Sequence, residues 1–521
     1  MAQFVRARLA DSAGQPAAAA QSYAALLLAE PGDIAMALRA YRGGLAAGDA
    51  PLALRAANIL AAQGALPAEG RLLLLGEAFT KGNKQAPGLV VDTLQKEGNF
   101  EFIVPMLRAW ADYRAGARPD GPHGGAASGP ASGYAGEQRA LLRIAEGGSA
   151  EGVTLFQSLA ANGASYSSTG ARIAAAGLLS RARKRDAAMA VLSGQSPAIA
   201  AARLRAGGRG SLAAPKDVAA TGVSLLLLRL AEDIGGREPG ALSVSLARIA
   251  TFLDPANDAA WLATADMLRA QGKAEPALAA VARVNPKSVW RSQATDLRVT
   301  LLASGGDPAD ALALAQAAAA ASSARSGDFT RLGDLLVNQG RQAEAATAYR
   351  EAIARTEEEG AAADWSVWLL LGSALKQAGE WDAAKTALEK ALALAPGQAV
   401  VLNYLGYAQL ERRENLAEAE ALIVRANAIS PDDASFIDSL GWAYHVRGDS
   451  KRAVATLERA VAGLPAESIM NEHLGDAYWA AGRRIEARYA WRNALVTADD
   501  EASARLKAKG DLGWTAATAA P

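Results

Sequence analysis

No cysteine occurs in this chain of 521 residues, so the sequence excludes disulfides, thiolate zinc sites and cysteine nucleophiles. An excess of one charge is also missing, because 54 Lys and Arg residues balance 54 Asp and Glu residues. A balanced chain has no general attraction to nucleic acid or to an anionic membrane, and we expect neither as a partner. Long apolar runs are absent too, since the Ala-rich stretch from Ala311 to Ala324 is shorter than the roughly 18–20 residues of a membrane-spanning helix.

Aromatic residues are scarce, at 6% of the chain, whereas 51% of the residues are hydrophobic. Most of that hydrophobic content is Ala and Leu, in runs separated by short breaks that contain Gly and Asp. Ala and Leu are strong helix formers, and the β-branched and aromatic residues that sheets prefer are few. The composition therefore predicts an all-helical protein.

The sequence repeats itself with a period of about 34 residues, which is typical of helical repeat proteins. A Gly followed five residues later by Ala marks the same period upstream, for example at Gly14, Gly48, Gly272 and Gly306. The clearest marker is a Leu-Gly pair, which occurs at Leu332-Gly333, Leu371-Gly372, Leu405-Gly406, Leu440-Gly441 and Leu474-Gly475.

Each unit has the pattern of two amphipathic helices joined by a turn. In the unit that starts at Ala434, apolar residues from Ile437 to Tyr444 share one face of a first helix. Gly448 marks the turn, and Pro465 ends the second helix because proline has no backbone N–H. We expect small residues to let the two helices approach closely, with Gly441 facing Ala453 and Ala460.

These units resemble the tetratricopeptide repeat. Its pattern of Trp, Leu-Gly, Ala and Pro at fixed positions is matched by Trp368, Leu371, Gly372, Leu375, Ala384, Leu388, Ala391 and Pro396. The resemblance implies an all-α fold, namely an α-α superhelix of roughly 11–13 helix-turn-helix units. It also implies a protein that binds other proteins or peptides in a concave groove.

Breaks in the pattern suggest a domain organisation. A Gly- and Pro-rich stretch is expected to be a flexible insertion, and Gly207 to Lys216 a linker. The predicted parts are N-terminal repeats over 1–116, the insertion over 117–133, degenerate helical repeats over 134–220, a repeat array over 221–500 that is clearest over 326–500, and a capping helix with a disordered tail over 501–521.

No catalytic motif is present: the sequence has no phosphate-binding loop, no nucleophile elbow and no zinc-protease motif. Three histidines occur, at His123, His445 and His473. Two of them lie near acidic residues, which makes a metal site conceivable, but scattered His and carboxylates on such a surface are more often plain surface or groove residues. We predict that the protein is not an enzyme and that it has no catalytic residue, metal or cofactor.

The resemblance assigns the groove to set positions on the first helix of each unit, among them the fifth, ninth and twelfth. Carried onto this sequence, these positions select a predicted partner-binding set of nine residues: Asn403, Tyr407, Leu410, Asp438, Trp442, His445, Glu472, Asp476 and Trp479. Glu411 and Val446 lie beside them at the thirteenth position.

The aromatic members of this set allow two interpretations. Trp442 and Trp479 either fill the seams between repeats or are exposed, and the sequence favours neither. If they are exposed together with Tyr407, the groove suits an extended or helical peptide with apolar anchors and some basic character. A clamp for a terminal carboxylate is disfavoured, because its basic residues are missing and Asp438 stands at one of those positions.

The C-terminal units also resemble large proteobacterial envelope proteins, some of which are adaptors that present substrates to proteases. That resemblance implies an adaptor or scaffold in the periplasm or cell envelope. Arg6 and Arg8 interrupt any apolar leader within the first ten residues, so export requires a leader before Met1, and otherwise we expect a cytoplasmic protein. A cytoplasmic scaffold or co-chaperone is the alternative function, and a metal-dependent enzyme is a remote one.

Overall fold

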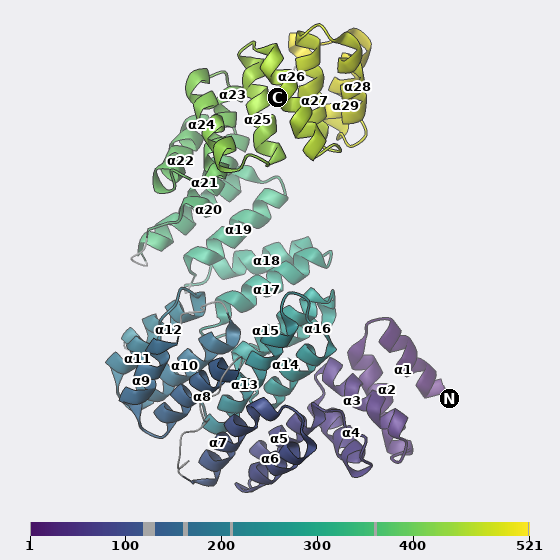
Figure 1. Ribbon diagram of the computed structural model, residues 1–521, viewed down its shortest axis with the longest axis vertical. Coiled ribbons are helices and arrows are strands. Elements are labelled where there is room, and N and C mark those ends of the chain that lie inside the picture. Colours follow the sequence, from purple (N-terminus) through teal and green to yellow (C-terminus); the bar gives the residue numbers. More distant parts are fainter. Residues whose placement is uncertain are drawn as a thin grey trace. The chain divides into compact units, whose positions relative to one another are not determined.

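The structure is a computed structural model that describes residues 2–117, 131–159, 165–208, 212–322, 324–358, 362–518 and 520. These residues form 29 α-helices and two short 3-10 helices, and no strand occurs among them. The expected all-α superhelix is therefore confirmed (Figure 1). The chain divides into two compact units, residues 1–314 and 315–521, called here the N-terminal and C-terminal units.

The N-terminal unit holds α1 to α17 and most of α18. Their bounds are α1 Ala2–Ser12, α2 Pro16–Ala29, α3 Ile34–Ala47, α4 Ala50–Ala62, α5 Gly70–Thr80, α6 Ala86–Glu97, α7 Val104–Ala115, α8 Ala131–Ala145, α9 Ser149–Ser158, α10 Tyr166–Arg181, α11 Arg185–Val191, α12 Pro197–Gly207, α13 Val218–Gly235, α14 Ala241–Leu253, α15 Asp258–Ala270, α16 Ala274–Val281, α17 Arg291–Ser304 and α18 Pro308–Ala319.

The C-terminal unit contains five hairpins and a last helix. Their bounds are α19 Ser326–Asn338, α20 Gln342–Glu358, α21 Trp365–Gln377, α22 Trp381–Leu394, α23 Ala399–Glu411, α24 Leu416–Ile429, α25 Ala434–Val446, α26 Ser450–Gly463, α27 Ser468–Ala480, α28 Arg484–Ala494 and α29 Asp500–Leu512.

Short polar side chains and glycines set the ends of the repeat helices. The carboxylate of Asp433 accepts hydrogen bonds from the backbone N–H groups of Ser435 and Phe436, which begins α25. At the turn Gly448 has φ of 83°, a left-handed conformation that glycine adopts without strain. Asp449 then caps α26 by accepting from the N–H of Arg452. The turn expected at Gly448 is confirmed.

The two helices of each C-terminal hairpin meet at a glycine that has no room for a side chain. A Cβ built on Gly441 would lie 2.6 Å from Cγ of Leu457. The expected close approach is thus present, but its partner is Leu457 rather than Ala453 and Ala460. The same crowding recurs in the other four hairpins, where the shortest Cβ contacts are Gly333 with Tyr349 at 2.5 Å, Gly372 with Leu388 at 2.6 Å, Gly406 with Ile423 at 2.8 Å and Gly475 with Trp491 at 2.4 Å.

The N-terminal unit is not a simple linear stack. Helix α13 is buried along most of its length and contacts α5, α7, α8, α10 and α15, and its partner α14 packs on α5 and α3. A linear array would contact only its sequence neighbours. Arg248 of α14 is 3% exposed, and its Nε donates to the carbonyl of Leu45 at the end of α3, 3.1 Å away. Burial lowers the pKa of Arg248 to about 10.

The structure describes only parts of the segments that were expected to be irregular. Residues 118–130 of the expected insertion lie outside the described residues, whereas 131–133 belong to α8. The linker expected at Gly207 to Lys216 follows the end of α12, and its residues 209–211 are also outside. The prediction of disorder from Gly510 onward is wrong, because α29 continues to Leu512 and a 3-10 helix follows at Ala516–Thr518.

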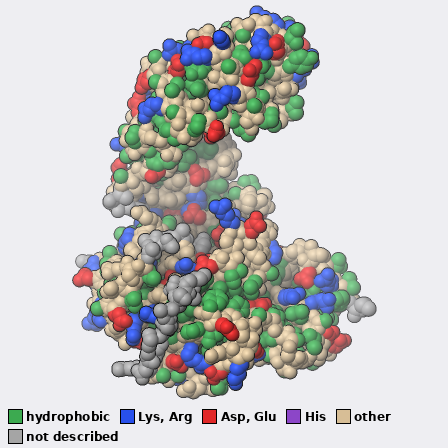
Figure 2. All heavy atoms as spheres, in the orientation of Figure 1, with side chains coloured by type: hydrophobic (Ala, Val, Ile, Leu, Met, Phe, Trp, Pro, Cys, Tyr) green, Lys and Arg blue, Asp and Glu red, His purple; other side chains and the backbone are tan. Residues whose placement is uncertain are grey.

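Surface charge follows the balanced composition. Figure 2 shows acidic and basic side chains interspersed on the face in view. Of the helices in the described ranges, none combines the length and the apolar character that crossing a membrane requires.

We predict that the glycine contacts set the stability of the C-terminal unit. Gly441→Leu should lower the free energy of unfolding by about 1–3 kcal/mol, because the added side chain must displace Leu457. Gly397→Leu is the matched control, since a Cβ there meets no atom within 4 Å. Denaturant unfolding followed by circular dichroism measures both, and equal midpoints for the two variants would contradict the prediction.

Candidate partner-binding face

The nine predicted residues lie on the first helices of three successive hairpins, α23, α25 and α27 (Figure 1). These helices pack against one another in sequence order, since α23 contacts α25 and α25 contacts α27. Their common side is called here the first-helix face. The structure therefore brings the predicted residues together, but it buries many of them.

On α23 the three predicted residues differ in exposure. Leu410 is 1% exposed and packs with Ala419, Ile423 and Ala443, so it is a core residue. Asn403 is half-buried, and its Oδ1 has no hydrogen-bond partner in the described part of the chain. Tyr407 is half-buried, and burial together with nearby carboxylates raises the pKa of its hydroxyl.

Trp442 of α25 fills a seam between repeats. It is 5% exposed, and the rings of His445 and His473 stack on it with centroids 4.7 and 4.1 Å away. His473 is fully buried, and its Nδ1 lies 2.9 Å from Oδ2 of Asp438. Nε2 of the same ring lies 3.5 Å from the hydroxyl of Tyr407. For Trp442 the packing interpretation is correct.

The acidic residues of α27 hold basic residues of α29. Glu472 is 1% exposed and accepts from Nε and a terminal nitrogen of Arg505, both at 2.8 Å, and from Nζ of Lys509 at 2.6 Å. Burial alone would raise the pKa of Glu472, but Arg505 and Lys509 outweigh it and lower the pKa. Glu472 is thus ionised and paired within the chain.

Asp476 is the second acceptor for the same lysine. Its two oxygens lie 2.7 and 2.8 Å from Nζ of Lys509, which is 0% exposed. Asp476 also accepts from the indole N–H of Trp491 at 2.9 Å and from the backbone N–H of Ala520 at 3.2 Å. The last helix and the end of the chain therefore cover two of the predicted positions.

Trp479 is half-buried at the same end of the face. Its ring centroid lies 5.4 Å from that of Trp491, and the guanidinium of Arg484 lies 3.8 Å from its centroid. Gly513, with φ of 86°, passes so close that a Cβ would lie 2.2 Å from this indole. Tyr407 and Trp479 are thus half-buried and Trp442 is buried, so the three aromatic residues do not form a continuous exposed surface.

The neighbouring part of the face, between α21 and α23, carries Glu411 together with three polar residues that the sequence-based selection missed, namely Ser373, Lys376 and Tyr404. The hydroxyl of Tyr404 donates to Oγ of Ser373 at 2.8 Å, and Lys376 pairs with Glu411 at 2.5 Å. All four side chains are half-buried. Ser373 and Lys376 occupy the ninth and twelfth positions of the preceding unit, so the rule used for the later units would have found them there.

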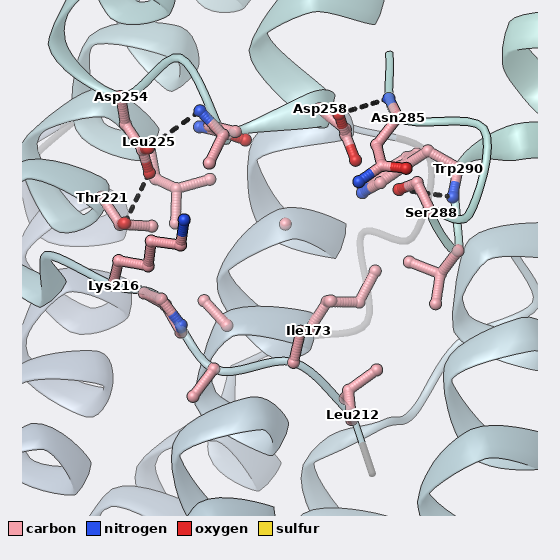
Figure 3. Close-up of a pocket in the computed structure, with 18 of the residues that line it drawn as sticks. Ile173, Leu212, Lys216, Thr221, Leu225, Asp254, Asp258, Asn285, Ser288 and Trp290 are labelled. Carbon is pink, nitrogen blue, oxygen red and sulfur yellow. Dashed lines mark hydrogen bonds between the residues drawn. The ribbon is translucent and has the colours of Figure 1, made fainter. Parts of the chain in front are cut away.

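The N-terminal unit contains a separate cavity of about 350 Å³ (Figure 3). Asp254 accepts from the hydroxyl of Thr221 at 2.5 Å on one side, and Asp258 accepts from the backbone N–H of Asn285 at 3.0 Å on the other. Burial raises the pKa of both carboxyl groups. Ile173 and other apolar side chains complete the wall.

Metal binding was a remote alternative for the histidines. Among the residues with described positions, His, Asp and Glu form no group of three or more that could hold a metal ion. Instead, His445 and His473 stack on Trp442, and His473 is paired with Asp438. His123 lies outside the described residues.

Comparison with known proteins identifies the repeats. Residues 365–410 and 329–359 match two family models, each described as tetratricopeptide repeat. TPR repeat-containing protein PA4667 of Pseudomonas aeruginosa is 34% identical over 85 residues. That match covers 16% of this chain and 14% of the relative, so the chain spans a small part of the relative's length.

Solved structures with similar parts are also repeat proteins. A tetratricopeptide repeat protein from Parabacteroides merdae is 15% identical with a TM-score of 0.40, and the match covers 47% of this chain and 95% of that one. TTC0263 of Thermus thermophilus is 22% identical with a TM-score of 0.31, covering 35% and 97%. YrrB, described as a TPR protein with an unusual peptide-binding site, is 19% identical with a TM-score of 0.28, covering 33% and 87%.

We predict that Lys509 fixes α29 on the repeat array. Lys509→Met leaves Glu472 and Asp476 buried without their shared cation, and should destabilise the last hairpin by about 3–5 kcal/mol. Amide hydrogen exchange over α27 to α29 measures the loss. Lys507→Met is the control, because Lys507 is an exposed residue of the same helix, and equal exchange in both variants would disprove the role of the lysine.

We also predict a pH-dependent stability from His445. Burial, helped by nearby positive charge such as Lys509, lowers its pKa from 6.5 to about 4, so the unfolded chain binds the proton more readily. Stability should fall as the pH falls from 6.5 towards 4, by up to about 3 kcal/mol from this group.

His445→Phe keeps a ring against Trp442 and removes the titrating group. The difference in unfolding free energy between this variant and the wild type should grow over that pH range and be constant above pH 6.5. A difference that does not change between pH 7 and pH 4.5 would refute the assignment.

Proposed function

We propose that this chain, which carries tetratricopeptide repeats, is a non-catalytic scaffold that binds segments of partner proteins on the first-helix face of its C-terminal unit. Tetratricopeptide repeats indicate a protein-interaction scaffold, and proteins built from them are generally non-catalytic. The more specific part of the proposal concerns which surface of the chain binds the partner and which side chains of the partner it contacts.

The observation that carries the proposal is the way α29 is held. Glu472 and Asp476 are the fifth and ninth residues of their unit and lie on α27. They bind basic side chains of a helix, α29, through charge-assisted hydrogen bonds. The first-helix face thus has the chemistry to bind a helical segment with basic residues. On α27 the chain itself supplies that segment.

The same positions of α23 carry Asn403 and Tyr407, which are half-buried. Oδ1 of Asn403 has no partner in the described part of the chain, and a buried acceptor without a partner costs about 1–3 kcal/mol. A donor from a bound segment would remove that cost. Val400, which is 38% exposed, lies on the same helix and offers an apolar contact. The carboxylate of Glu411, at the end of this helix, pairs with Lys376 at 2.5 Å, and a basic side chain of a bound segment would have to share or displace that lysine.

We therefore propose that partners bind across α21 and α23 through an extended or helical segment with an apolar anchor and a basic side chain. Of the nine predicted residues, Asn403 and Tyr407 are best placed for contact. Asp438, Trp442, Glu472 and Asp476 would support the face from within, by holding successive first helices together.

The test is a triple variant, Val400→Ala, Asn403→Ala and Glu411→Gln, in the full chain. Partners captured from cells of the native organism should be retained at least about tenfold less, because a few central contacts carry most of the binding energy. The control is Glu389→Ala with Lys390→Ala, two exposed residues on the second helix α22. Unfolding midpoints must match in all three proteins, and equal retention by the triple variant would reject this site.

A role as an adaptor in the cell envelope, for example one that presents substrates to a protease, remains a proposal. It rests on the resemblance of the C-terminal units to envelope proteins. Fractionation of the native cells decides between the envelope and the cytoplasm, and recovery in the cytoplasmic fraction would favour the alternative of a cytoplasmic scaffold or co-chaperone.

A further inference from the structure

The outward side of α28 exposes large apolar side chains. Ile485 is 70% exposed, Tyr489 is 62% exposed, and Val496, just past the end of the helix, is 81% exposed. The spacing of four residues places Ile485 and Tyr489 on one side of α28, and Val496 follows in the turn after the helix. These three residues are called here the stripe. The side chains that α28 packs inward are Ala487, Trp491 and Ala494, so this stripe is not part of the core.

The preceding hairpins provide an internal control for this stripe. Their second helices have a buried alanine equivalent to Ala487, and the three positions that correspond to the stripe are exposed in every case. At those positions the chain places small or polar residues, namely Asp382, Thr386 and Ala393 on α22, Ala417, Ala421 and Ala428 on α24, and Lys451, Ala455 and Ala462 on α26. The large apolar residues are thus a feature of α28 and not of the repeat.

Basic side chains surround the stripe. Arg492 lies 5.8 Å from the ring centroid of Tyr489, Arg484 stacks on Trp479, and Nε of Arg488 donates to the carbonyl of Gly510 at 3.1 Å. These contacts hold the guanidinium groups in place beside the stripe. The acidic residue within α28, Glu486, is paired with Arg483, so this helix carries net positive charge, while Asp499 and Asp500 follow Val496 at the start of α29.

We propose that this outward face of α28 is a docking site for an acidic helical segment of a partner protein, with aliphatic residues on one side and Asp or Glu on the flanks. The spacing of the stripe suits a helix that packs ridge into groove on α28. Arginines held in place form bidentate pairs with carboxylates at a smaller entropic cost than free ones.

A second copy of the chain fits this face poorly. Two α28 helices packed on each other would bring Arg488 and Arg492 of both chains together, and like charges in contact are unfavourable. The exposed apolar pair on α1, Val5 and Leu9, is likewise flanked by Arg6 and Arg8. Neither of these two apolar surfaces of a second copy therefore supplies the acidic flanks that the arginines favour, and we assign the complementary surface to another protein.

This site lies on the second-helix side of the array and is distinct from the first-helix face proposed above. A bound partner would touch Ile485, Tyr489 and Val496 rather than Asn403 and Tyr407. Either proposal can therefore fail while the other holds.

The test uses the full chain and three labelled model helices of about 18 residues, which is five turns. The first has Leu on one side and Glu on the flanks, the second has Leu and Lys, and the third has Ala and Glu. Fluorescence anisotropy should show the Leu/Glu helix binding at least about tenfold more tightly than either of the others. Raising the salt from about 0.05 to about 0.5 M should weaken the Leu/Glu complex, because salt screens the arginines.

In the key variant, four residues of the proposed site are replaced by the residues that α26 has at the equivalent positions. The substitutions are Ile485→Lys, Tyr489→Ala, Arg492→Glu and Val496→Ala. Since α26 holds Lys451, Ala455, Glu458 and Ala462 at these positions, the variant keeps a surface that the repeat tolerates. It should bind the Leu/Glu helix at least about tenfold more weakly. The control is Lys451→Ala with Arg459→Ala, two exposed residues of α26, and should bind as the wild type does.

Three results would overturn the proposal. Equal binding of the Leu/Glu and Leu/Lys helices would show that the charge of the bound helix does not affect its affinity. Binding to phosphatidylglycerol vesicles that the key variant loses, without any binding of the Leu/Glu helix, would assign the face to a lipid surface. A dimer in sedimentation velocity that the key variant abolishes would assign it to a second copy of the chain.

Discussion

The C-terminal unit depends on one steric constraint, which is that the two helices of each hairpin cross where a Cβ does not fit. At Gly333, Gly372, Gly406, Gly441 and Gly475 the nearest side-chain atom lies within 2.8 Å of where that Cβ would be. The glycine brings the helix axes close, so a Leu, Ile, Tyr or Trp of the second helix lies directly on the backbone of the first. Each hairpin is therefore a compact piece with an inner and an outer side, and stacking such pieces produces the array.

Successive hairpins contact one another through polar residues of their first helices. Asp438 of α25 binds His473 of α27, and Glu472 and Asp476 of α27 bind Lys509 of α29. A buried carboxylate is tolerated because each one meets a donor or a cation. These residues therefore join repeats to one another, and they also join α29 to the last hairpin.

The two surfaces proposed for partners differ in character. On the first-helix face the proposed surface lies upstream, around Asn403, whose Oδ1 has no partner in the described part of the chain, and around the ion pair of Lys376 and Glu411, where the side chains are half-buried. On the opposite side most second helices present small or polar residues, whereas α28 presents Ile485, Tyr489 and Val496.

The sequence by itself determined the helices, the hairpins and the repeat period, because local propensity, glycines and turn residues act within one unit. It also placed the nine candidate residues on neighbouring first helices. The sequence did not show that Trp442 is buried or that Glu472 and Asp476 pair with a basic residue of the same chain. It also did not show that the last helix continues over Gly510 to Leu512. Those answers came only from the tertiary structure, because burial and ion pairing depend on which distant segment covers a residue. For Trp442 the cover includes His473, and for Glu472 and Asp476 it is Lys509.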